Sequence, residues 1–251
     1  MEDLSGDQYP FHITEKIGSG YTLFDALSNY GAIKPGRALN TMLSLVDTVR
    51  MIDSCGYVHG DIKPENIVLD GKGKPYLVDF GLATAKSTDL SKVECRRGTI
   101  GYLPPEYLIS GSDATMQHND TFALWTTFYQ LLNRALPLDM KHLGSDSAKM
   151  KYHFKWMCHG NFPTIAGKLI GNGAPKSLAE NLDDFFQNAF SERFESVDHL
   201  YTQLTKLAED HIDQMPKSYE SKLSVPSSQV RMSGDVDQFA TTTSFILVNS
   251  G

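Results

Sequence analysis

The spacing of apolar residues along the chain predicts a mostly helical protein. Between residues 35 and 55 apolar side chains recur every three or four positions, as on one buried face of an amphipathic helix. The same spacing recurs in residues 178–189 and 197–207, whereas residues 118–132 are apolar on nearly every face, which indicates a central, buried helix. The three stripes consist of Leu39, Met42, Leu43, Val46, Val49 and Ile52; Leu178, Leu182, Phe185, Phe186 and Ala189; and Val197, Leu200, Tyr201, Leu204 and Leu207.

Strand signals are short and few. Residues 67–69 and 75–78 are β-prone and flank a turn sequence at 70–73, so we expect a β-hairpin there. A third β-like run covers residues 11–17, and Thr22 is suited to cap a short helix after it. Together the patterns predict an α+β fold that is mainly α with a small β component.

Between residues 139 and 176 the pattern is weaker. Phe154, Trp156 and Met157 favour one helix, and residues 167–175 favour a loop because of their glycines and proline. No metal site is indicated by the adjacent Cys158 and His159, since no further ligand follows at metal spacing.

Composition narrows the class of protein. A chain of 251 residues that is 41% hydrophobic can bury one sizeable core, which predicts one domain plus a polar tail. Its net charge of −7 argues against nucleic-acid binding. Three cysteines without C-x-x-C spacing indicate neither a disulfide framework nor a zinc site, so a reducing, cytoplasmic location fits best. No apolar run approaches the roughly 18 residues that span a bilayer, so we expect no membrane segment.

The densest chemical signal lies in residues 59–66, HGDIKPEN, which fit the pattern H-x-D-x-K-P-x-N. An aspartate on a tight loop can accept the proton of a hydroxyl, and a lysine two residues later can neutralise a phosphate. The predicted hairpin then leads to the sequence DFG and returns the chain so that Asp79 lies beside Asn66. Oxygens of these two side chains suit Mg²⁺. The stretch therefore predicts a phosphate-transfer site.

This stretch closely resembles the catalytic loop and DFG turn of protein kinases. The resemblance implies a kinase-like C-terminal lobe that binds ATP and Mg²⁺. It assigns Asp61 as catalytic base, Lys63 to the γ-phosphate, and Asn66 and Asp79 to Mg²⁺, with His59 as structural support. By the same resemblance, Lys63 favours serine or threonine acceptors in a protein substrate.

Four further residues match supporting positions of the family. Thr99 would lie near the catalytic aspartate and lysine and help to hold both, the alternative being a turn threonine. Glu106, in Pro-Pro-Glu, would pair with Arg193, the alternative being a solvated arginine. Asp120 would accept backbone N–H groups of the catalytic loop, the alternative being a simple helix N-cap.

The amino-terminal segment limits how much of a kinase the chain can hold. Gly18-Ser19-Gly20 looks like the start of a glycine-rich loop, but only 38 residues separate Gly20 from His59. The segment better resembles the last small-lobe strand and the hinge, which places Glu15 and Ile17 beside ATP. We therefore expect the N-terminal lobe, with its glycine-rich loop and lysine strand, to be largely absent.

Three regions follow from this alignment with the family. They are a hinge-like segment at residues 1–17, a kinase-like large lobe at 18–213, and a disordered tail at 214–251. A large lobe without its small lobe would expose apolar groups, among them Ile13, Ile17, Leu69 and Val78. We expect the amino-terminal residues and the tail segment 245–248, or a protein partner, to cover that face.

The leading functional hypothesis is a serine/threonine protein kinase. Because the glycine-rich loop and the strand lysine are missing, the alternative is a pseudokinase or docking module, or a truncated kinase, with weak or no catalysis. Gly60 stands where most regulated kinases have the arginine that receives an activation-segment phosphate, so we expect no such switch. His-Gly-Asp also resembles kinases of small molecules, which leaves a small-molecule phosphotransferase as a minor alternative.

Overall fold

A computed structural model describes residues 17, 20–88, 98–104, 117–191 and 194–216. Helices dominate it, which confirms the mainly α fold with a small β component. The elements in chain order are α1 (Leu23–Tyr30), α2 (Pro35–Ser54), β1 (Tyr57–Val58), the 3₁₀ turn η1 (Pro64–Asn66), β2 (Ile67–Leu69), β3 (Pro75–Leu77), β4 (Thr84–Ala85), α4 (Gln117–Asn133), α5 (Asp146–His159), α6 (Ala166–Gly171), α7 (Lys176–Ser191), α8 (Val197–Asp210) and η3 (Ile212–Gln214).

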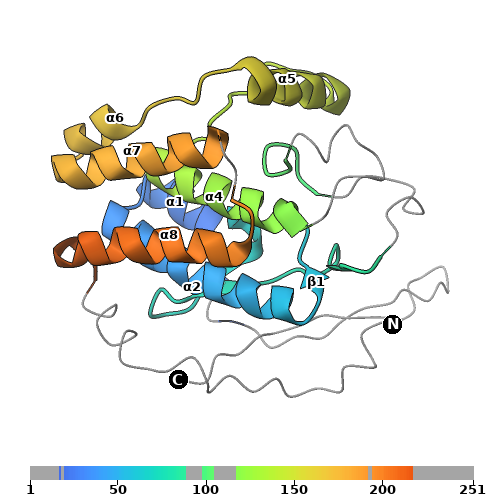
Figure 1. The fold of residues 1–251 in the computed structure, drawn as a ribbon, viewed down its shortest axis with the longest axis horizontal. Coiled ribbons are helices and arrows are strands. Elements are labelled where there is room, and N and C mark those ends of the chain that lie inside the picture. Colours follow the sequence, from blue (N-terminus) through green and yellow to red (C-terminus); the bar gives the residue numbers. More distant parts are fainter. Residues whose placement is uncertain (1–16, 18–19, 89–97, 105–116, 192–193, 217–251) are drawn as a thin grey trace.

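The centre of the body is α4, which packs against α2, α7 and α8 (Figure 1). Its residues from Asn119 to Tyr129 are all buried, as the apolar pattern predicts for a central helix. Helices α2 and α8 also pack on each other, and their apolar stripes enter the same core. All the predicted stripe residues of α2, α7 and α8 are buried except Tyr201, which is half-buried. These helix predictions are confirmed.

Two short antiparallel strand pairs carry the loops at one end of α2. Strands β2 and β3 form the predicted hairpin, with Ile67 opposite Leu77 and Leu69 opposite Pro75. Strand β1 pairs with β4, which brings Tyr57 opposite Ala85. The segment of residues 59–66 is thereby held at both ends, by β1 before it and by β2 after it.

Helix α1 begins as its sequence predicts. Thr22 is the N-cap, and its hydroxyl accepts a hydrogen bond from the backbone N–H of Asp25 at 3.1 Å. The Asp25 carboxylate in turn accepts the backbone N–H of Thr22 at 2.9 Å, which completes a capping box.

One prediction of local structure is wrong. Residues 167–171 belong to α6 and are not loop, although Gly167 and Gly171 disfavour a helix. The helix forms because Leu169 is buried in the core, and because the Asp183 carboxylate accepts the backbone N–H of Ile165 at 2.7 Å just before the helix. Tertiary contacts therefore override the local propensity.

Candidate active site

The candidate site centres on the carboxylate of Asp61, which lies in the loop between β1 and β2 and is 9% exposed. Lys63 Nζ donates to Oδ2 of Asp61 at 2.6 Å. The Thr99 hydroxyl donates to the other oxygen, Oδ1, at 2.6 Å and accepts from Lys63 Nζ at 2.8 Å. Asn66 Nδ2 donates to Oδ2 of Asp61 at 3.0 Å and to its backbone oxygen at 2.8 Å. Four of the residues singled out from the sequence thus share one hydrogen-bonded cluster.

This cluster keeps Asp61 ionised. Burial by itself would raise the pKa of the carboxyl group, but hydrogen bonds from Lys63, Thr99 and Asn66 and the lysine charge outweigh it. The net result is a pKa of Asp61 below its ordinary value. At neutral pH the site therefore presents a carboxylate beside an ammonium group, a pair suited to a hydroxyl and a phosphate respectively.

A buried aspartate of α4 holds the loop backbone. One oxygen of Asp120 accepts the backbone N–H of His59 at 2.7 Å, and the other accepts that of Gly60 at 2.9 Å. Its carboxylate thus bonds to the loop as the kinase resemblance implies, 60 and 61 residues away in the chain. Burial raises the pKa of Asp120, and these two bonds oppose the rise.

His59 connects the loop to the sequence DFG. Its ring is completely buried, lies 4.7 Å from the Phe80 ring in an edge-on arrangement, and makes a 3.2 Å contact between Nε2 and the backbone oxygen of Val78. Burial lowers the pKa of His59 below its ordinary value, although the Asp120 charge and the Val78 carbonyl act in the opposite direction. His59 therefore acts as a neutral, packed link between the loop and the end of the hairpin.

Asp79 follows the hairpin and comes directly after Val78, which pairs with Asn66. The backbone N–H of Val78 donates to the backbone oxygen of Asn66 at 2.9 Å, so the predicted return of the chain is confirmed. Asp79 has a φ of 64°, in the left-handed region that few non-glycine residues adopt, and it is exposed. Residues in such strained conformations gather at functional sites.

Two glycines, whose packing the sequence pattern did not reveal, bring three segments of the site together. Gly60 has a φ of +82°, and a β-carbon there would lie 3.0 Å from the backbone oxygen of Leu82. Gly98 has a φ of +117°, and a β-carbon there would lie 2.9 Å from the backbone oxygen of Gly60. The loop backbone is therefore packed between the chain that follows DFG and the chain that leads into Thr99. A steric requirement of this kind depends on segments far apart in sequence, so spacing alone cannot show it.

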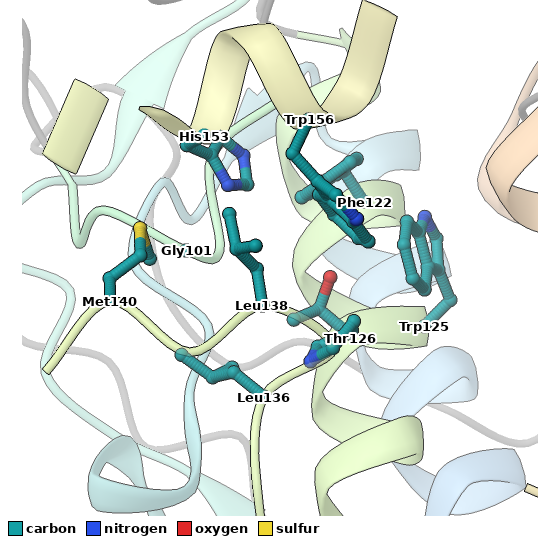
Figure 2. Close-up of a pocket in the computed structure, with 10 residues that line it drawn as sticks. Gly101, Phe122, Trp125, Thr126, Leu136, Leu138, Met140, His153 and Trp156 are labelled. Carbon is teal, nitrogen blue, oxygen red and sulfur yellow. The ribbon is translucent and has the colours of Figure 1, made fainter. Parts of the chain in front are cut away.

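A small apolar cavity lies beside Gly101, two residues after Thr99, and is not a substrate cleft. Figure 2 shows Gly101 and Met140 on one side of it, and His153 and Trp156 of α5 with Phe122 of α4 on the other. Its volume is about 10 Å³, room for about one water molecule. The cavity lies where α5 contacts the segment that contains Thr99. In this contact His153 Nε2 lies 3.0 Å from the backbone oxygen of Leu103.

Several predicted site residues lie outside the described residues. These are Glu15, Glu106 and Arg193. The expected pairing of Glu106 with Arg193 therefore stays a prediction. The boundaries of the three regions, 1–17, 18–213 and 214–251, also stay predictions. Ile17 is described and half-buried, and its backbone oxygen accepts the N–H of Gly20 at 3.0 Å.

The face expected to be apolar is described in part. Leu69 and Val78 are half-buried, as Ile17 is, whereas Ile13 and residues 245–248 lie outside the described residues. What covers this face therefore stays a prediction.

Two searches of the described residues bear on metals and membranes. No group of three or more His, Cys, Asp or Glu side chains able to hold a metal ion occurs among them. A Mg²⁺ ion needs no such group, because it commonly takes one or two protein ligands and completes its shell with phosphate oxygens and water. None of the described helices is long and apolar enough to cross a bilayer.

Comparison with known proteins gives a consistent result. The family described as Protein kinase domain matches residues 2–202. Serine/threonine-protein kinase PrkC of Bacillus subtilis is 30% identical over 158 residues, which cover 59% of this chain and 24% of PrkC. From Arabidopsis thaliana, serine/threonine-protein kinase PEPKR2 is 36% identical over 129 residues (51% and 26%), and 3-phosphoinositide-dependent protein kinase 1 is 37% identical over 130 residues (47% and 26%). In each case the match spans about a quarter of the relative.

Proposed function

Because the chain belongs to the protein kinase family, we propose that it transfers the γ-phosphate of ATP to a serine or threonine hydroxyl of another protein. The observation that carries this proposal is the cluster in which Asp61 accepts hydrogen bonds from Lys63, Thr99 and Asn66. It combines an ionised base, a cation and an amide within one hydrogen-bonded group. The protein kinase relatives make phosphate transfer the chemistry that best fits it.

In this proposal the oxygen of the acceptor hydroxyl forms a bond to the γ-phosphorus of ATP, and Asp61 accepts the proton that this hydroxyl loses. The bond between that phosphorus and the oxygen bridging to ADP breaks, and ADP leaves with the bond electrons. Lys63, whose Nζ is 2.6 Å from Asp61, would neutralise charge on the transferred phosphoryl group. Thr99 keeps the base and the lysine in one orientation, because it bonds to both.

Asn66 and Asp79 are the residues that would hold Mg²⁺. The Asn66 side chain donates two hydrogen bonds through its amide nitrogen, so its oxygen is the atom suited to a cation. Asp79 contributes an exposed carboxylate that accepts the backbone N–H of Gly81 at 3.3 Å. Two hard oxygen ligands fit Mg²⁺, which when bound would neutralise charge on the ATP phosphates.

Transfer of labelled phosphate from Mg-ATP to generic protein acceptors tests the proposal. Asp61→Asn should lower the rate about 10²–10⁴-fold, since it removes the base but keeps its shape. Asp213→Asn changes the same group at an exposed position of η3 and should leave the rate as it is. Transfer that Asp61→Asn does not slow would exclude Asp61 from the mechanism.

A second candidate is a pseudokinase or docking module. It is favoured by the order of elements, because the 38 described residues between Gly20 and His59 form α1, α2 and β1 and hold no lysine strand. Thermal unfolding separates the two candidates. A kinase that binds Mg-ATP should melt at a higher temperature with the nucleotide than without it, whereas a pure docking module should show no shift at millimolar ATP.

A cytoplasmic location is also part of the proposal. Its support is the free state of Cys55 and Cys158, both exposed, which fits a reducing compartment.

A further inference from the structure

Helix α5 carries an unusual outward face. Positions two apart on a helix point in nearly opposite directions, so Lys151 and Lys155 lie opposite His153, which is buried. Tyr152 and Phe154 flank the two lysines and are 39% and 37% exposed. We name these four residues, Lys151, Tyr152, Phe154 and Lys155, the α5 patch.

Among the described residues, no ion pair balances the charges of this patch. Lys151 and Lys155 are one helical turn apart, an arrangement of like charges that disfavours a helix. Their further neighbours at that spacing are Ser147 and His159, which are not acids, and no ion pair among the described residues involves either lysine. The chain as a whole has a net charge of −7, opposite in sign to this pair of lysines.

One aromatic residue of the patch, Tyr152, is held in place. The Tyr152 ring contacts the His142 ring edge-on at 5.5 Å between centroids, which ties the helix to the loop before it. Beneath the patch, His153 and Trp156 (Figure 2) anchor the helix to the body, as does the buried Met157. Exposed aromatic side chains with limited freedom are typical of the centre of a protein interface, because their burial costs little conformational entropy.

The α5 patch is also linked to the candidate active site. His153 Nε2 lies 3.0 Å from the backbone oxygen of Leu103, and Leu103 follows Thr99 by four residues. Thr99 in turn donates to Asp61. A protein that bound the patch would therefore be held on the part of the molecule that contacts the catalytic loop.

From these observations we propose that the α5 patch docks an acidic segment of a partner protein, with glutamate or aspartate against the lysines and separate apolar side chains against Tyr152 on one side of them and Phe154 on the other. The extension that this partner is the phosphate acceptor rests on the proposed function. A protein segment fits better than nucleic acid or membrane, because two lysines on one helical turn are far fewer than the polybasic clusters those surfaces require. The aromatic residues in turn supply the apolar contact of a protein interface.

Binding can be measured without catalysis. The probe is a short fluorescein-labelled peptide of glutamates with two phenylalanines, added to the full chain and followed by fluorescence anisotropy. A matched peptide with glutamine for glutamate tests the charges. We expect the acidic peptide to bind at least about tenfold more tightly than its neutral match, with a difference that shrinks as salt rises from about 50 to 300 mM.

Variants locate the site. The double variant Lys151→Glu/Lys155→Glu should weaken binding of the acidic peptide at least about tenfold. The control Lys34→Glu/Arg37→Glu makes the same change in net charge at two exposed positions around the start of α2 and should bind as the unaltered chain does. Tyr152→Ser/Phe154→Ser should weaken binding at high salt as well, because it removes the apolar contact. Thermal unfolding of each variant checks that it is folded.

Four results of the binding measurements would overturn the proposal. They are no binding of the acidic peptide, equal binding of its neutral match, equal loss in the α2 control, and binding, instead, of vesicles of phosphatidylserine and phosphatidylcholine through the patch. A concentration-dependent dimer that the patch variant abolishes would assign the surface to a second copy and would overturn it too. A chain that binds the peptide without transferring phosphate fails only the proposed function. One that transfers phosphate without binding the peptide fails only this inference.

Discussion

The Thr99 hydroxyl donates to Asp61 at 2.6 Å although the two residues lie 38 positions apart in the chain. The same oxygen accepts from Lys63 Nζ, so it fixes the base relative to the cation. A side chain in this position controls two properties of Asp61 together, its orientation and its pKa. Each can be measured separately.

Thr99→Val keeps the shape of the side chain and removes the hydroxyl. The pKa of Asp61 should rise, because one of the hydrogen bonds that lower it is lost. Phosphate transfer should fall about 10–100-fold, as is common when a residue that orients a reacting group is removed. NMR titration of the Asp61 carboxyl carbon gives the pKa even if transfer is too slow to measure.

The control for this prediction is Thr202→Val, an exposed position of α8 whose hydroxyl bonds only to the helix backbone. It should leave the pKa of Asp61 and the transfer rate as they are. An unchanged Asp61 titration in Thr99→Val would contradict the role given to this hydroxyl.

Asp120 provides a prediction about stability. Asp120→Ala leaves the buried N–H group of His59 and the half-buried N–H group of Gly60 without this acceptor, which should lower the free energy of unfolding by about 2–4 kcal/mol. Asp120→Asn keeps one acceptor oxygen and should cost about half as much. Urea denaturation at neutral pH measures both. Equal stability of Asp120→Ala and the unaltered chain would show that the loop does not depend on this carboxylate.

His59 provides a prediction about pH. Burial places its pKa in the folded protein below the 6.5 of the unfolded chain. Between those two values the unfolded state binds more protons, so stability is full above pH 6.5 and falls as the pH drops below it. The slope from this residue can reach about 1.4 kcal/mol per pH unit.

Substituting His59→Gln should flatten the fall in stability between about pH 7 and 5. Urea denaturation across this range gives the slope for each variant. The matched change His142→Gln, at an exposed position, should retain the slope of the unaltered chain. If His59→Gln and the unaltered chain lose stability in parallel, the proton taken up on unfolding belongs to another group.

Much of the site follows from sequence because its residues are close together along the chain. One short hairpin, with its turn at residues 70–73, joins the motif at residues 59–66 to Asp79. A hairpin of this length can adopt few geometries. The structure accordingly brings Asp61, Lys63 and Asn66 into one cluster. The central position of α4 also follows from its sequence, because a helix that is apolar on every face must be surrounded.

The parts that sequence does not predict depend on tertiary contacts. Helix α6 contains two of its six residues as glycine and forms because Leu169 is buried and Asp183 meets its start. Likewise, the close approach of Gly98 to the backbone of Gly60 joins segments that no local pattern connects. Neither feature changes the hydrophobic periodicity, which is the main signal that a single sequence offers.

Gly98→Ala tests the close approach. A β-carbon at Gly98 would meet the backbone oxygen of Gly60 at 2.9 Å and Leu103 Cδ2 at 2.7 Å, so the chain before Thr99 would have to shift. We expect a loss of about 1–3 kcal/mol in stability and a raised pKa of Asp61, as Thr99 moves away.

Gly73→Ala is its matched control. Gly73 has a φ of +79°, so alanine is strained there too, but nothing lies within 4 Å of the added carbon. This variant should lose stability without any change in the Asp61 titration. If Gly98→Ala also left the Asp61 titration unchanged, the packing of the two glycines would have no part in positioning Thr99.

Gly36 lies in the first turn of α2. Replacing it with alanine should lower the stability of the protein, although helix propensity favours alanine. Alanine is a better helix former than glycine and would ordinarily stabilise α2. At Gly36, however, a β-carbon would overlap the backbone oxygen of Gln214, in the η3 turn that follows α8. Gly36→Ala must therefore displace that turn or the start of α2, and we expect it to cost about 1–3 kcal/mol in the free energy of unfolding.

Gly167→Ala, in α6 with open space around the added carbon, should instead gain about 0.5 kcal/mol. Urea denaturation of both variants measures the two signs, and stabilisation by Gly36→Ala would mean that η3 does not pack on α2 in solution.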